Sequence, residues 1–224
     1  MSLKSQPLSV SAYDTLRDEI LTGRIPGDTL WSDREIAERM KFSRTPVREA
    51  VQRLAAEGLV EVIPRRGTRV LPLQVDDVRE IHQIAKALEL EASVLLANRS
   101  DRDLAPVEKA VQEMEEALSR EDRDAWAEAD LGFHQAIVDG CGNNRLAQLY
   151  HGQRVLTDRA RYFALHLRPL PVQSAEEHRA MYEAIIARDI ETLSRLYQEH
   201  WGRTTDELVE LVERHANVMP IKAN

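Results

Sequence analysis

The sequence predicts a mainly α-helical protein, with an N-terminal winged helix-turn-helix followed by an all-α bundle of six to seven helices. Short strand-like runs are confined to residues 59–73, whereas apolar residues elsewhere recur at helical spacing. The segment "FSRTPVREAVQRL" (42–54) has the periodicity of a buried helix but carries two arginines and a threonine near its start. Charge divides the chain as well, because the first 72 residues are mildly basic and the remainder is acidic.

The charge balance separates a head from a body. Residues 1–72 hold 12 Lys and Arg against 10 Asp and Glu, and the rest hold 18 against 28, giving −8 overall. This asymmetry is expected if only the head meets a polyanion. The single cysteine, Cys141, excludes a disulfide framework and suits a reducing compartment. The chain begins without the apolar core of a signal peptide, and no apolar run approaches about 18 residues, so we expect a cytoplasmic protein without a membrane partner.

Three helices and a hairpin make up the expected head. The first helix stops at "TGRIPGD", whose Gly and Pro favour a loop. Ser32 caps the second helix, and Glu35 three residues later completes a capping box. Thr45 and Pro46 open the third helix, which Gly58 ends. The runs "LVEVI" and "TRVLPL" flank "PRRG" and predict a hairpin, the wing. Its tip carries Arg65 and Arg66.

Arg44 and Arg48 lie one turn apart at the start of the third helix, while its apolar residues face the other way. In a helix-turn-helix, the second helix of the pair enters the DNA major groove by its N-terminal end, where a guanidinium can contact guanine O6 and N7. Two arginines alone would suit a solvated helix face equally well. The turn before them and the basic hairpin after them favour double-stranded operator DNA as the partner.

The segments "YDTLRDEILTGRIPGD" (13–28) and "DREIAERMKFSRTPVREAVQRLAAEGLVEVIPRRGTRV" (33–70) resemble the GntR family of bacterial transcription regulators. The resemblance implies groove and phosphate contacts from the second and third helices. It also places Gly67 in the part of the wing that reaches the minor groove. The predicted DNA-binding set is Arg34, Arg44, Thr45, Arg48, Arg65, Arg66 and Gly67.

The body has only helical periodicity and no internal repeat. Capping residues predict helix starts at Asp76, Asp103 or Pro106, Asp124, Asn143, Ser174 and Asp189. Ser174 and Glu177 have the spacing of a capping box. The apolar stripe of the first body helix is expected to contain Val78, Ile81, Ile84, Leu88, Ala92 and Leu95. A bundle of six such helices resembles the effector domain of the FadR subfamily of GntR regulators, called the FCD domain.

Four polar residues of the body are predicted to face its core. Asp130 and His134 lie one turn apart on the third body helix, and His178 and His200 lie on the apolar sides of two others. A single inward histidine is more often a satisfied core residue than a ligand. Three histidines and one carboxylate that converge from three helices instead predict a metal site, because an unpaired buried carboxylate costs several kcal/mol. The FCD resemblance implies the same four ligands.

The donor set suits Zn²⁺ first, although Ni²⁺, Mn²⁺, Co²⁺ and Fe²⁺ accept the same ligand types. The other histidines are predicted to lie outside the site: His82, His151, His166 and His215. FCD-type regulators usually carry an arginine two residues before "aLE", which holds an effector carboxylate, but "IAKALE" has Ala85 there. Lys86 points about 100° away around the helix. The resemblance implies a small effector, an organic acid, although this chain lacks the arginine that would hold its carboxylate.

These observations predict a homodimeric, ligand-responsive transcription regulator that binds a palindromic operator, and not an enzyme. Its DNA-binding domain would span residues 1–72, and its metal- and effector-binding domain residues 76–216. A metal-dependent hydrolase with a DNA-binding appendage is a weaker alternative, because no spare carboxylate is evident as a general base. A repressor without an effector, whose metal is purely structural, is the other alternative.

Overall fold

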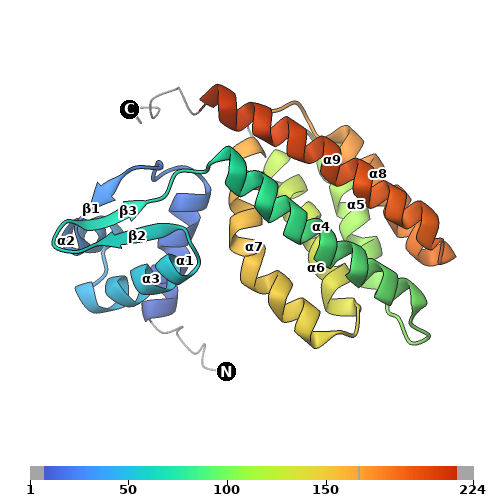
Figure 1. Ribbon diagram of the computed structural model, residues 1–224, viewed down its shortest axis with the longest axis horizontal. Helices are drawn as coiled ribbons and strands as arrows, with labels where there is room; N and C mark the ends of the chain where they lie inside the picture. Colours follow the sequence, from blue (N-terminus) through green and yellow to red (C-terminus); the bar gives the residue numbers. More distant parts are fainter. Residues whose placement is uncertain (1–7, 166, 216–224) are drawn as a thin grey trace. The chain divides into compact units, whose positions relative to one another are not determined.

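The computed structural model describes residues 8–165 and 167–215 (Figure 1). The chain divides into two compact units between Leu73 and Gln74, and each has its own buried residues. The first unit is a winged helix-turn-helix, and the second is built from helices alone in its described part. The mainly helical fold class predicted from the sequence is therefore confirmed.

The first unit holds the three helices and the hairpin in the order expected, with one further strand between the first two helices. Ser32 and Glu35 form the predicted capping box, in which the Ser32 side chain accepts a hydrogen bond from the Glu35 backbone N–H. Val47, Val51 and Leu54 are buried, so the third helix turns its other face outward. The elements are α1 (Leu8–Leu21), β1 (Leu30–Trp31), α2 (Asp33–Met40), α3 (Arg44–Ala56), β2 (Val60–Ile63) and β3 (Gly67–Val70).

The sheet has one more strand than the predicted hairpin. Its order is β1-β3-β2, and all neighbours are antiparallel. With only two residues, Leu30 and Trp31, β1 is too short to leave a periodic pattern in the sequence. Gly67 makes this pairing sterically feasible, because a Cβ at this position would lie 2.3 Å from the carbonyl oxygen of Trp31. Its φ of +126° also favours glycine.

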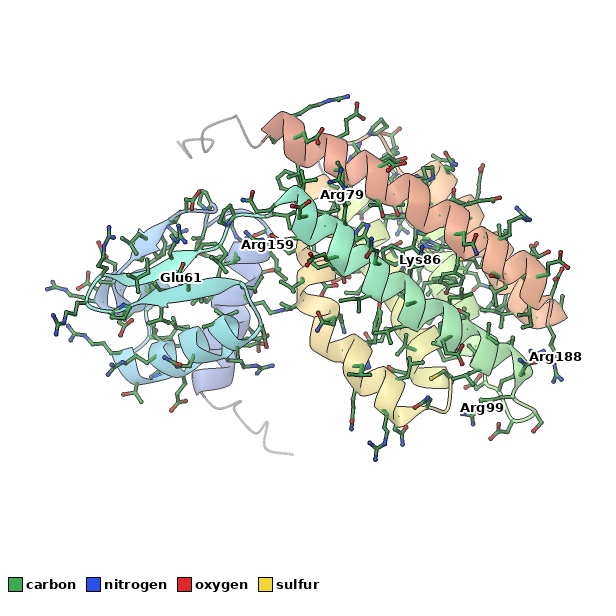
Figure 2. The ribbon with its side chains drawn as sticks, in the orientation of Figure 1. Glu61, Arg79, Lys86, Arg99, Arg159 and Arg188 are labelled. Atoms are coloured by element: carbon green, nitrogen blue, oxygen red, sulfur yellow. The ribbon has the colours of Figure 1, made fainter. Side chains whose placement is uncertain are left out.

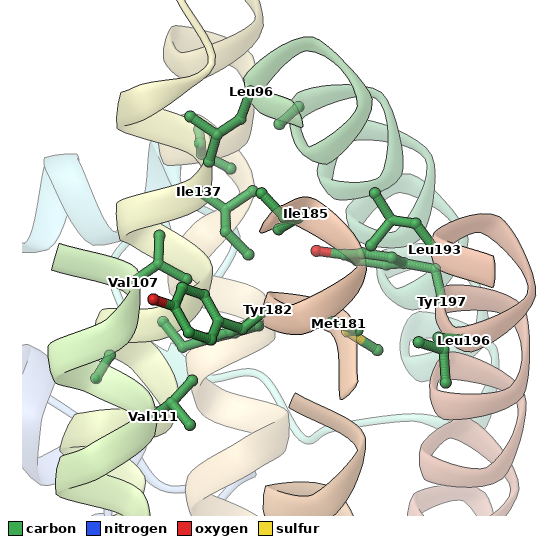
Figure 3. Packing of buried hydrophobic residues seen from close by; sticks show 14 of the residues in the cluster. Leu96, Val107, Val111, Ile137, Met181, Tyr182, Ile185, Leu193, Leu196 and Tyr197 are labelled. Atoms are coloured by element: carbon green, nitrogen blue, oxygen red, sulfur yellow. The ribbon is translucent and has the colours of Figure 1, made fainter. Parts of the chain in front are cut away.

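The second unit contains six helices in its described part. In Figure 1, α4 and α9 lie side by side, and these two helices are in extensive contact. Apolar side chains from several helices, among them Leu96, Ile137 and Ile185, meet in one core (Figure 3). None of the described helices is both long and apolar enough to span a membrane. The helices are α4 (Val75–Asn98), α5 (Ala105–Ser119), α6 (Arg123–Gly140), α7 (Asn144–Leu165), α8 (Val172–Ala187) and α9 (Ile190–His215).

Three predicted helix starts in the second unit are wrong in detail. Gln74, and not Asp76, is the N-cap of α4. Asp122, and not Asp124, caps α6, because its Oδ1 accepts the backbone N–H of Ala125 at 3.0 Å. The Ser174–Glu177 capping box does not form, because α8 has already begun at Val172. Helix starts expected at Asn143 and Asp189 agree with the structure, where both side chains accept N–H groups of the following turn.

The buried face of α4 differs from the predicted stripe. Ile84 is 44% exposed, although the stripe included it. The face turned to the core keeps Val78, Ile81 and Ala92 of the stripe, and it also carries three polar side chains, each at most 5% exposed: His82, Glu89 and Ser93. Helix α4 is therefore a mixed apolar and polar wall of the unit, and its polar groups are candidates for function.

Candidate functional site

All seven residues predicted to contact DNA line one open groove of about 670 Å3 in the first unit. The N-terminal ends of α2 and α3 form one side, and the β2–β3 hairpin forms the other. The remaining lining residues are Ser32, Asp33, Val62, Ile63 and Pro64. Positive side chains thus converge on the one surface that a helix-turn-helix presents to DNA.

The arginines of this groove are held only weakly. Arg48 lies 3.2 Å from Asp33, and Arg34 lies 2.7 Å from Glu38, but both guanidinium groups are largely exposed. Exposed pairs of this kind contribute at most about 1 kcal/mol, so a phosphate or base can displace the carboxylate. Arg69 does not line the groove. It pairs with Glu61 of the neighbouring strand at 2.7 Å (Glu61 is labelled in Figure 2).

Three histidines from three helices meet inside the second unit. His134 (α6), His178 (α8) and His200 (α9) offer ring nitrogens that all lie within 4.8 Å of one another. The rings of His178 and His200 are 4.7 Å apart between centroids, and those of His134 and His178 are 5.0 Å apart. All three side chains are buried. The convergence expected from the sequence is present.

Two carboxylates, one buried and one partly exposed, orient two of these rings. The Nδ1 atom of His134 lies 2.7 Å from Glu89, and the Nδ1 atom of His200 lies 2.6 Å from Glu177. A carboxylate that accepts the Nδ1–H group leaves Nε2 as the lone pair that can ligate a metal, an arrangement common around protein metal sites. Glu89 also accepts the hydroxyl of Tyr150 at 2.9 Å. Sequence reasoning missed this role of both glutamates. A carboxylate that contacts a histidine of the cluster from another helix follows no fixed spacing in the sequence.

Among the three histidines, the surroundings of His178 indicate most clearly that the cluster suits a metal ion. It is fully buried, and neither of its ring nitrogens has a hydrogen-bond partner among the described residues. Burial, followed by the nearby His200, lowers the pKa of His178 well below its ordinary value, so the ring is neutral at pH 7. A buried imidazole with two unpaired nitrogens is costly unless a ligand binds it. The donor set therefore fits a divalent metal ion.

Asp130 lies beside the cluster rather than at its centre. Its Oδ1 atom is 3.5 Å from Nδ1 of His178 and 3.8 Å from Nε2 of His134. Its Oδ2 atom is 3.5 Å from Nε of Arg161. Burial opposes ionisation of Asp130, but Arg161 and the histidines outweigh it and hold the pKa well below its usual range. Asp130 is thus a carboxylate within reach of the cluster.

A small cavity of about 40 Å3 opens next to the cluster. By the usual measure of about 10–15 Å3 per water, it has room for about three water molecules. His82 of α4 lines the cavity and is buried, so the prediction that it lies off the buried face of its helix is wrong, although the histidine cluster does not include it. Ala85 and Lys86 (labelled in Figure 2) are not among the described lining residues, whereas Arg161 and Arg168 are. Positive charge therefore reaches the cavity from α7 and the turn after it, not from α4.

Two of the other histidines have hydrogen-bond partners away from the cluster. His151 hydrogen-bonds Asp139 at 2.8 Å on an exposed part of the second unit. His215 contacts the carbonyl oxygen of Leu211 at 2.8 Å in the last turn of α9, where it complements the helix dipole. His166 lies outside the described residues.

His82 should make the metal-free protein sensitive to acid. Burial, aided by Arg161, lowers its pKa to about 3, against about 6.5 when unfolded. Between these values the unfolded chain binds a proton that the folded chain does not, so stability falls as pH decreases below 6.5. From pH 6.5 to 5.5 this loss is about 1 kcal/mol. Urea denaturation at both pH values should show that His82→Phe removes it; an unchanged loss would mean that His82 is charged in the folded protein.

A winged helix-turn-helix with a basic groove, joined to a helical unit with a buried histidine cluster, defines a two-domain transcription regulator. The chain belongs to the GntR family of bacterial regulatory proteins, whose pattern matches residues 8–70, and its body is an FCD domain, matched over residues 80–203. The family predicted from the sequence, with its FadR-like subfamily, is therefore confirmed.

Relatives along most of the chain agree with this assignment. A probable D-xylose utilization operon transcriptional repressor of Paenarthrobacter nicotinovorans is 34% identical over 185 residues, covering 81% of this chain and 80% of that one. The transcriptional repressor RspR of Escherichia coli is 25% identical over 215 residues, covering 95% and 94%. The solved structure of E. coli McbR/YncC shares the fold, with a TM-score of 0.76 at 21% identity over 92% of this chain and 98% of that chain. The two sequence relatives are named as transcriptional repressors and not as enzymes.

Proposed function

We propose that the protein is a ligand-responsive regulator that binds a palindromic operator as a homodimer in the cytoplasm. In this proposal, a small effector, an organic acid, binds beside a divalent metal in the helical unit and changes DNA binding. The observation that supports it most directly is His178, a fully buried imidazole without a partner for either nitrogen. In this proposal the metal gives His178 the partner that it lacks, and the effector completes the site.

On the DNA side, Arg48 and Arg44 would read base edges in the major groove from α3. Arg34 and Thr45 would contact phosphates, and the wing would reach the minor groove through Arg66. Arg65 and Gly67 complete this set, Arg65 as a further phosphate contact. The groove shared by all seven residues supports this division of roles.

In the helical unit, His134, His178, His200 and Asp130 would hold the metal, with Zn²⁺ the ion best suited to this donor set. Bound there, the metal would act as a Lewis acid that accepts an oxygen atom of the effector. Glu89 and Glu177 would keep the two neighbouring rings in the ligating tautomer. Arg161 would keep Asp130 ionised.

A hydrolase is disfavoured by what the nearby carboxylates do. Glu89 accepts hydrogen bonds from His134 and Tyr150, and Glu177 from His200 and Arg203. A general base needs a free lone pair near the attacking water, and both carboxylates are committed to holding side chains. A structural metal without an effector is the remaining alternative; an effector that changes operator affinity would exclude it.

Selection of binding sites from random DNA should return an inverted repeat with half-sites about one helical turn, or a multiple of it, apart. Light scattering of the free protein should give twice the 25.6 kDa of one chain, because one head makes too few base contacts for specific binding. A single half-site from selection, together with a monomer at micromolar concentration, would contradict the dimer. Metal-loaded protein should change its operator affinity when the effector is added, whereas metal-stripped protein should not.

A further inference from the structure

Several residues that line the cavity beside the histidine cluster have hydrogen-bond donors without acceptors. Four of its residues carry buried N–H atoms without a hydrogen-bond partner among the described residues: Nε1 of Trp126, Nε1 of Trp201, Nη1 of Arg161 and Nε of Arg168. Both indoles belong to side chains that are at most 4% exposed. Indole and guanidinium groups only donate, so these four atoms require an acceptor. A carboxylate provides acceptors only and suits them.

His82 adds the opposite kind of group. Its Nδ1 atom lies 2.8 Å from the hydroxyl oxygen of Thr205, and that hydroxyl donates its one proton to the carbonyl oxygen of Trp201. Thr205 can therefore only accept from His82, which places the imidazole proton on Nδ1. The Nε2 atom of the neutral ring is then a bare lone pair. No described residue hydrogen-bonds it, and the ring lines the cavity.

We infer that His82 selects ligands that carry a hydroxyl group beside their carboxylate, so that the cavity takes a small hydroxy acid in preference to the simple acid. The carboxylate accepts from Arg161, Arg168 and the indoles, and the hydroxyl donates to Nε2 of His82. This inference rests on the proposed function of the cavity as the effector site. It also assigns the anion-binding role to arginines of α7 and the following turn, in a chain that has Ala85 on α4.

The size of the cavity limits the acid. Room for about three waters, each about 30 Å3 in the liquid, corresponds to about five non-hydrogen atoms. Glycolate and acetate both meet this limit and differ by one hydroxyl group. They are therefore a matched pair of probes for the role of His82.

Calorimetric titration of the zinc-loaded full chain, without DNA, tests the inference. Glycolate should bind at least tenfold more tightly than acetate, because acetate leaves the lone pair of His82 unpaired. In His82→Phe, which keeps a ring against Trp201 but has no lone pair, the two affinities should agree within twofold, through a loss on the glycolate side. His151→Phe, at an exposed histidine, should keep the wild-type preference. Arg168→Met should weaken both acids alike, because both carry the carboxylate.

Two results do not depend on any variant folding. The ¹⁵N spectrum of the wild-type protein should show His82 protonated at Nδ1 and bare at Nε2, and inorganic phosphate should bind less tightly than glycolate. The inference is overturned by the reverse tautomer, by equal or absent binding of the two acids, or by tighter binding of phosphate. Glycolate binding with this preference but without any change in operator affinity would support the inference and count against the proposed function.

Discussion

Zinc-loaded wild-type protein is expected to lose about 4 kcal/mol of unfolding free energy when a chelator removes the metal. This value corresponds to a free metal concentration about a thousand times the dissociation constant. A metal shared by α6, α8 and α9 cross-links three helices in the folded state and has no comparable site in the unfolded chain. For a protein of this length the melting temperature should fall by about 8–16 °C.

In His178→Ala and His200→Ala, the chelator should lower neither the unfolding free energy nor the melting temperature, since each variant lacks one proposed ligand. Elemental analysis should find one zinc per wild-type chain and close to none in these variants, and the chelator should leave their melting temperatures unchanged. His151→Ala is the control, because that ring bonds only an exposed aspartate near the surface. Glu177→Gln should retain zinc with about 10–100-fold lower affinity, because the amide orients His200 less firmly. Full zinc content in both alanine variants would show that the cluster is an ordinary polar core.

The convergence of the histidine cluster was predictable from the sequence, but the carboxylates that orient two of its rings were not. Asp130, His134, His178 and His200 lie on helix faces marked by large apolar neighbours, so helical periodicity places all four inward. His82 and Glu89 lie on the buried face of α4. The predicted stripe correctly contained Val78, Ile81 and Ala92, but it also took in the exposed Ile84 and left out both polar residues. The buried face of α4 includes polar residues, and hydrogen bonds to side chains on helices far away in the sequence offset the free-energy cost of burying them. Those partners become visible only once the helices are packed.

The same distinction applies in the head. A capping box predicted the start of α2, and apolar spacing predicted α3, since both signals are properties of a few neighbouring residues. Strand β1 was missed because its two residues depend on pairing with β3, which is distant in sequence. Gly67 was predicted only as part of the wing. The steric need for glycine against Trp31 is a tertiary fact, and it gives Gly67 a structural role independent of any DNA contact.

Arg48→Ala is expected to lower affinity for the specific operator by about 1–3 kcal/mol and to relax preference at one base position, whereas Arg65→Ala should weaken binding to all sequences alike. Arg48 stands near the N-terminal end of α3, the end of a recognition helix that enters the major groove, and its contact with Asp33 is too exposed to hold it back. Arg65 lies in the turn between β2 and β3, and its exposed side chain is free to contact a phosphate. Arg65→Ala should therefore also reduce the slope of log affinity against log salt by about one.

Fluorescence anisotropy with the selected operator, its single-base variants and unrelated DNA, at several salt concentrations, separates these outcomes. Arg24→Ala is the charge-matched control, because Arg24 pairs with Asp18 and does not line the groove. That variant should lose little affinity for any sequence. The folded head should survive all three changes, since none of these side chains is buried. If Arg48→Ala kept both full affinity and full base preference, α3 would not be the helix that reads the operator, and the groove would have to bind DNA through its phosphate contacts alone.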